Sequence, residues 1–190
     1  MNIVDIEAVA KVAHDAGLPL VVDNTFASPY LCRPIEHGAT LVVHSLTKYM
    51  TGNGTVTGGA IVDSGKFDWS ASDKFPSLSQ PEPAYHGLNF HETFGPAAFT
   101  FHGIAIGLRD LGMTLNPQAA HYTLMGIEPL SMRMNNHIAN AKKIAGDPKK
   151  KPAEKQAAAK AATTELTAAK TSTTKAATAK TNADQAVATA

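Results

Sequence analysis

Four side chains suited to covalent chemistry follow two short apolar segments in this sequence. Asp23 comes directly after the first segment, and Ser45, Thr47 and Lys48 follow the second. A lysine forms an imine with an aldehyde once its amine is neutral, which burial or a nearby positive charge favours. A carboxylate keeps a pyridine nitrogen protonated, and hydroxyl groups bind phosphate oxygens. These residue types suit a phosphorylated pyridine aldehyde; the alternative from the residues alone is that Lys48 is a solvated surface lysine that follows a buried strand.

The two apolar segments have the pattern of buried strands. Residues 20–22 (LVV) and 41–43 (LVV) are short and unalternating, and residues 59–62 (GAIV) form a third such run. An amphipathic helix is expected over residues 2–16. This order predicts an α/β fold with an open sheet covered on both faces. Ligands of such sheets bind beyond the carboxyl ends of the strands, where the candidate site residues fall.

One long loop and three helices are expected after the strands. Residues 63–93 contain scattered aromatic residues and prolines, which indicates a long ordered loop. Helices are predicted over residues 94–111, from Asn116 as the N-cap, and from the break at Gly126 to residue 146. The last helix carries an apolar stripe, so it needs a surface to pack against.

The composition changes at residue 147. Residues 1–146 contain 9 Lys and Arg against 12 Asp and Glu, whereas residues 147–190 contain 8 Lys against 4 acidic residues. The lysines of this second part recur at a spacing that circles a helix and leaves no apolar face. We therefore expect one domain over residues 1–146 and a disordered or weakly helical tail. The positive charge of the tail is dilute, so a nucleic-acid partner is not expected.

Several protein classes do not fit the sequence. No apolar run approaches the roughly 18 residues that span a bilayer, and the first residues are acidic where a signal peptide would be basic. A cytoplasmic protein without a membrane partner is the expectation. Cys32 is the only cysteine and the eight histidines lack ligand spacing, so no disulfide and no metal site is expected.

Three runs of residues resemble the central region of the pyridoxal-phosphate enzymes of cysteine and methionine metabolism. They are residues 22–31 (VDNTFASPYL), 33–39 (RPIEHGA) and 44–49 (HSLTKY). The resemblance implies that residues 1–146 are part of the large domain of a fold-type I enzyme, which has three layers and a mostly parallel sheet. It also implies pyridoxal 5'-phosphate as the cofactor and, for an intact enzyme, a homo-oligomer.

The same resemblance implies a role for each candidate residue. Lys48 would form the Schiff base with the cofactor and later transfer protons, and Asp23 would pair with the pyridinium nitrogen. Ser45 and Thr47 would bind the phosphate.

The segment after Lys48 is most similar to one branch of that family, the O-acetylhomoserine sulfhydrylases. The similarity lies in residues 51–55 (TGNGT), 58–63 (GGAIVD), 67–69 (FDW) and 85–87 (YHG). Enzymes of this branch make homocysteine and acetate from a small amino-acid substrate, O-acetylhomoserine, and sulfide. Cystathionine synthases and lyases usually have a shorter segment here and are the alternative within the family.

Departures from the family pattern favour a further hypothesis. Members of the family are considerably longer, and Met1 falls inside their large domain. Their arginine that grips the substrate carboxylate lies in a segment without counterpart here, and Asn136 stands where another arginine is common. We interpret Arg133 as structural rather than as a replacement. The chain is then a truncated, non-catalytic remnant of such an enzyme, for which little or no turnover is expected.

A different enzyme class is suggested by Ser45-Leu46-Thr47-Lys48. This is an S-x-x-K pattern, in which Ser45 would be an acylated nucleophile and Lys48 its base. The pattern needs the serine at the start of a helix, whereas the apolar run predicts that Ser45 follows a strand. The companion motifs are also absent, because Lys74 follows Ser72-Asp73 where asparagine is needed.

Overall fold

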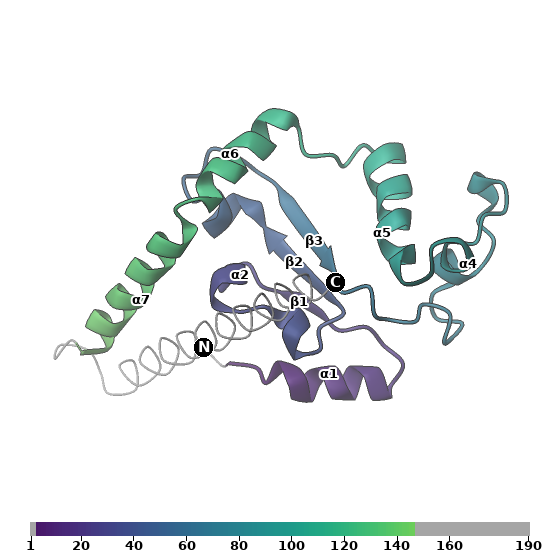
Figure 1. Ribbon diagram of the computed structural model, residues 1–190, viewed down its shortest axis with the longest axis horizontal. Coiled ribbons are helices and arrows are strands. Elements are labelled where there is room, and N and C mark those ends of the chain that lie inside the picture. Colours follow the sequence, from purple (N-terminus) through teal and green to yellow (C-terminus); the bar gives the residue numbers. More distant parts are fainter. Residues whose placement is uncertain (1–2, 147–190) are drawn as a thin grey trace, which may run out of the picture.

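A computed structural model describes residues 3–146 of the chain. In Figure 1 a small sheet lies between helix α7 (Leu130–Gly146) on one side and helix α5 (Ala98–His102) on the other. The expected domain boundary lies at the edge of this range, and the expected tail over residues 147–190 lies outside it. Within residues 3–146, none of the helices combines the length and the apolar character that crossing a membrane requires.

The sheet contains three strands in the order β1 (Val21–Asp23), β2 (Leu41–Ser45) and β3 (Gly59–Asp63). The three predicted strands are therefore present, each within two residues of its expected position. Strand β1 pairs with β2 in parallel, whereas β3 pairs with β2 in antiparallel. The described sheet is thus mixed, with one parallel and one antiparallel pair, where a mostly parallel sheet was expected.

All three strands were predicted to be buried on both faces. This prediction was wrong for the two outer strands, β1 and β3. Leu41 and Val42 of β2 are buried, but Val21 of β1 is 50% exposed and Ile61 of β3 is 63% exposed. An apolar, β-branched run has the same sequence pattern in a central strand and in an outer strand, so periodicity could not separate the two cases.

Helix α1 (Ile6–Asp15) begins later than predicted. Asp5 is its N-cap and accepts a hydrogen bond from the backbone N–H of Ala8 at 3.0 Å. Asn2, the predicted cap, lies outside the described residues, and the helix begins at Ile6 rather than next to Asn2. The helix ends before Gly17, which adopts a positive φ of 66°.

The segment expected as a long loop contributes one of the two apolar clusters. It contains α3 (Pro76–Ser79), a 3-10 turn η3 (Pro83–Tyr85) and the start of α4 (Phe90–Phe94). Buried residues from this segment, β2 and α5 form the cluster, namely Leu41, Trp69, Leu78, Phe90 and Ala98. The Trp69 and Phe99 rings stack at 5.3 Å, so the aromatic residues anchor an otherwise irregular segment to α5.

The single helix predicted over residues 94–111 is divided. A 3-10 turn η4 (Gly95–Ala97) precedes α5, and a π-helical stretch η5 (Gly103–Asp110) follows it. The physical reason for the first break is Pro96, which has no backbone N–H to continue the helix. Phe101 and Leu108, predicted to be buried, are exposed.

Helix α7 forms the other apolar cluster with the segment after β1, and α6 (Pro117–Ile127) precedes α7 in the chain. Asn116 caps α6 as predicted. The apolar stripe of α7 is buried at Leu130, Met134 and Ile138, which pack against Leu31 of α2 (Ser28–Leu31). The break between α6 and α7 comes after Ile127, not at Gly126 as predicted. Pro129 lies at the break and has no backbone N–H to continue the helical hydrogen bonds, while Glu128 before it keeps helical backbone angles.

Gly126 allows α6 to touch the turn that follows β2. A Cβ atom at this position would collide with the carbonyl oxygen of Thr51 and would lie 2.6 Å from that of Met50. Only a residue without a side chain permits so close an approach of the two backbones.

Gly126→Ala is expected to lower the free energy of unfolding by about 1–3 kcal/mol, because the added methyl group overpacks this contact. Urea denaturation measures the effect. Gly103→Ala is the matched control, since no atom would lie within 4 Å of the methyl group added there. That variant should be neutral or stabilised by up to about 1 kcal/mol. Equal effects at the two glycines would contradict the close approach.

Candidate functional site

The candidate residues meet at the carboxyl edge of β1 and β2. Asp23, Ser45 and Lys48 line one hollow of about 770 Å³. The other lining residues come from the segment after β1, the turn after β2 and helix α7; they are Thr25, Phe26, Tyr49, Gly52, Arg133, Asn136, His137 and Asn140. The hollow therefore combines a carboxylate, a hydroxyl and a primary amine.

Thr25 links the two strand ends at this edge. Its Oγ1 accepts a hydrogen bond from the backbone N–H of Ser45 at 2.8 Å, and its own N–H donates to the Asp23 carboxylate at 2.9 Å. Hydrogen bonds from the hydroxyl and then the N–H of Thr25 hold the pKa of Asp23 below its usual value, and His44 adds to the effect. Asp23 is therefore a carboxylate at neutral pH.

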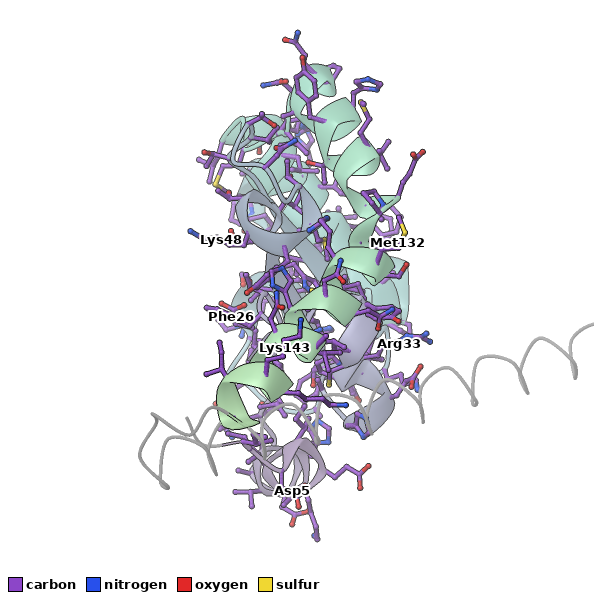
Figure 2. The ribbon with its side chains drawn as sticks, turned by 90° about the vertical axis from the view of Figure 1, so that its left-hand side faces the viewer. Asp5, Phe26, Arg33, Lys48, Met132 and Lys143 are labelled. Atoms are coloured by element: carbon purple, nitrogen blue, oxygen red, sulfur yellow. The ribbon has the colours of Figure 1, made fainter. Side chains whose placement is uncertain are left out.

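Lys48 lies on the single π-helical turn η2 (Leu46–Met50) that follows β2. Its backbone departs from helical geometry, with φ −93° and ψ −118°. The side chain is exposed, and Figure 2 shows it on the same side of the molecule as Phe26. Within the described residues, the neighbouring Tyr49 and Met50 therefore do not bury Lys48: Tyr49 lines the same hollow, and Met50 is itself buried.

Thr47 does not line the hollow. Its hydroxyl accepts a hydrogen bond from the backbone N–H of Gly58 at 3.0 Å and lies 3.4 Å from the Gly58 carbonyl oxygen, to which it donates. In this geometry Thr47 ties the turn after β2 to the start of β3. The structure thus brings three of the four predicted residues together and directs the fourth to the loop backbone.

The polar side chains that helix α7 adds to the hollow were not predicted from the sequence as site residues. Asn136, His137 and Asn140 present polar side chains to the hollow, and the His137 ring packs edge-on against Tyr49 at 5.1 Å. Their helical spacing indicates a shared face, but no local pattern shows which element that face meets. Thr25 was recognisable in principle, because a hydroxyl residue two positions after Asp23 is placed to cap its carboxylate.

His44 and Cys32 belong to a second, smaller hollow of about 260 Å³. Burial lowers the pKa of His44, although the charge of Asp23 opposes the shift. Burial also raises the pKa of the Cys32 thiol, and the charge of Glu36 adds to this. With a neutral imidazole and a protonated thiol here, Cys32 is a packing residue rather than a reactive one.

The residues of the first hollow fit pyridoxal phosphate. The ionised Asp23 suits a protonated ring nitrogen, the Lys48 amine suits the aldehyde, and the Ser45 hydroxyl suits a phosphate oxygen. Gly52 allows close approach of the backbone beside them. A metal does not fit equally well, because residues 3–146 contain no cluster of three or more His, Cys, Asp and Glu side chains in a metal-binding arrangement.

Serine acylation is not supported by the position of Ser45. The residue is the last of β2, as the apolar run predicted, and the helical element that it precedes is only the five-residue turn η2. Its backbone N–H already donates to Thr25.

Curated relatives share about half of their residues with the matched part of this chain. A sulfhydrylase, FUB7, from Gibberella moniliformis is 52% identical over 143 residues, which is 74% of this chain and 33% of the relative. A homocysteine synthase from Schizosaccharomyces pombe is 52% identical over 142 residues, with the same two coverages. The chain thus spans about a third of the length of these relatives.

A solved structure and a family model agree with these relatives. The crystal structure of a putative O-acetylhomoserine (thiol)-lyase from Campylobacter jejuni has a TM-score of 0.71 and 38% identity, and covers 76% of this chain and 36% of its own. It contains a pyridoxyl-lysine monophosphate residue. A model of the Cys/Met metabolism PLP-dependent enzymes matches residues 1–161, which extends past the expected boundary at residue 146. The chain therefore belongs to the Cys/Met metabolism PLP-dependent enzymes.

Proposed function

We propose that this chain carries the cofactor-anchoring part of an O-acetylhomoserine sulfhydrylase, which converts O-acetylhomoserine and sulfide into homocysteine and acetate. The observation that carries the proposal is the meeting of Asp23, Ser45 and Lys48 around one hollow. The names of the relatives, a sulfhydrylase, a homocysteine synthase and an O-acetylhomoserine (thiol)-lyase, support this chemistry over other reactions of the family.

Each residue contributes a separate interaction. Asp23 would hold the ring through its nitrogen, since its carboxylate stays charged. Ser45 would bind the phosphate. Thr47, whose hydroxyl bonds Gly58, would support the phosphate site through the backbone rather than by direct contact. Lys48 would bind the aldehyde carbon through Nζ, and later accept and return protons at that atom.

The position of these groups decides what the protein adds to the reaction. When bound, the pyridoxal ring accepts electron density from the reacting carbon atoms of the substrate. Asp23 and Lys48 would hold the ring, so the lysine amine would stay close to the carbon atoms whose protons it moves. In the overall reaction the bond from the γ-carbon to the acetate oxygen breaks, and a bond from the γ-carbon to sulfur forms. The assembly of the active enzyme as a homo-oligomer is part of the same proposal.

Lys48→Ala is expected to abolish covalent attachment of the cofactor. The purified chain is incubated with pyridoxal phosphate and reduced with borohydride, and the modified peptide is located by mass spectrometry. The wild-type chain should be modified at Lys48, and Lys66→Ala, which removes another exposed lysine, should behave like it. Modification spread evenly over surface lysines would contradict the proposal. An assay of homocysteine formation on the unreduced chain with pyridoxal phosphate then separates an enzyme from a non-catalytic remnant.

Asp23→Asn is expected to weaken the binding of pyridoxal phosphate about 10- to 100-fold, because a charge-assisted hydrogen bond is replaced by a neutral one. The variant keeps the shape of the side chain and its contact with Thr25. Equilibrium titration followed by absorbance measures the affinity. Asp15→Asn, which alters an exposed carboxylate paired only with Lys11, is the matched control and should leave the affinity unchanged.

A further inference from the structure

Arg133 of helix α7 reaches across to the turn that carries Lys48. Its Nη1 donates a hydrogen bond to the carbonyl oxygen of Tyr49 at 2.7 Å. Its Nη2 donates to the carbonyl oxygen of Met50 at 3.4 Å and to that of Gly126 at 2.5 Å. One guanidinium group therefore joins the lysine-bearing turn η2 to the end of α6.

The carbonyl groups that Arg133 binds need an outside partner. A helix leaves its last carbonyls without backbone donors, and η2 is only five residues long. A basic side chain can satisfy such carbonyls. Arginine suits this position better than lysine, because its planar group presents several N–H donors in fixed directions.

Packing around the guanidinium group shows that it is closely fitted. A Cβ atom at Gly52 would lie 2.6 Å from both Cζ and Nη1 of Arg133, so the glycine leaves room for the group. Met134, the next residue of α7, is buried against the cluster that includes Leu31, which holds the base of the arginine in place. The arginine also lines the same hollow as Lys48.

We propose that Arg133 is a positioning residue for Lys48. By binding the carbonyl oxygens of η2, it orients the lysine toward the cofactor. The proposal rests on the function proposed above, because it assigns Arg133 to the lysine that reacts. Because three backbone carbonyls bind its Nη atoms, we assign Arg133 to the turn and not to the substrate carboxylate.

The full-length chain without cofactor provides the first test, by hydrogen exchange. The amide of Thr51 bonds to Leu46, and that of Gly52 bonds to Lys48, so both report on the turn. Arg133→Met should accelerate exchange of these two amides about tenfold or more, since charge-assisted hydrogen bonds are lost, while β2 amides keep their wild-type rates. Lys142→Met removes a positive charge from the exposed side of the same helix and should leave the exchange rates of the Thr51 and Gly52 amides unchanged.

The second test follows attachment of pyridoxal phosphate to Lys48 by absorbance and borohydride reduction. Arg133→Met should slow the attachment about tenfold or more, and Arg133→Lys should restore part of the rate by keeping one donor and the charge. Wild-type rates in Arg133→Met, in both exchange and attachment, would overturn the inference. So would a loss of substrate affinity with an unchanged attachment rate, which would assign Arg133 to the substrate carboxylate.

The two proposals fail in distinguishable ways. If the wild-type chain is not modified at Lys48, the proposed function fails, while the exchange rates still decide whether Arg133 holds the turn. If Arg133→Met unfolds, Arg133→Lys decides: slower attachment with unchanged β2 exchange supports the positioning role, and wild-type attachment overturns it.

Discussion

The parallel pairing of β1 with β2 is the constraint on which the candidate site depends. Because Asp23 lies opposite Val43, both strands end at one edge and the residues that follow them meet. Thr25 then joins the two ends, since it binds both the Ser45 N–H and the Asp23 carboxylate. A slip of one residue would send the Asp23 side chain to the other face of the sheet and separate it from the lysine turn.

The conformation of η2, the turn that carries Lys48, depends on two helices that come much later in the chain. Burial of apolar side chains such as Leu130 and Met134 contributes about 1.5–3 kcal/mol each, which holds α7 in place. Gly126 brings α6 against the turn, and Arg133 satisfies its carbonyls. A turn of five residues has little core of its own, so these contacts decide its conformation.

The site is open on one side. Lys48 and Phe26 are exposed and lie on the same side of the molecule (Figure 2). Asp23 is nevertheless ionised because local hydrogen bonds from Thr25, rather than deep burial, set its pKa. The part of the site that contains Asp23 and Ser45 therefore forms from contacts within residues 23–45, whereas the Lys48 turn depends on the later helices.

The sequence by itself determined the strands, the cap of α6 and the residues that identify the family, because these depend on local patterns and on side-chain chemistry. It could not determine that β3 runs antiparallel, that Ile61 is exposed, or that Thr47 binds Gly58 and not the hollow. Those features depend on which elements of the folded chain contact one another, which no local pattern encodes. The tertiary structure alone placed Arg133 on the carbonyls of Tyr49 and Met50, because contacts between residues more than eighty positions apart leave no periodic signal.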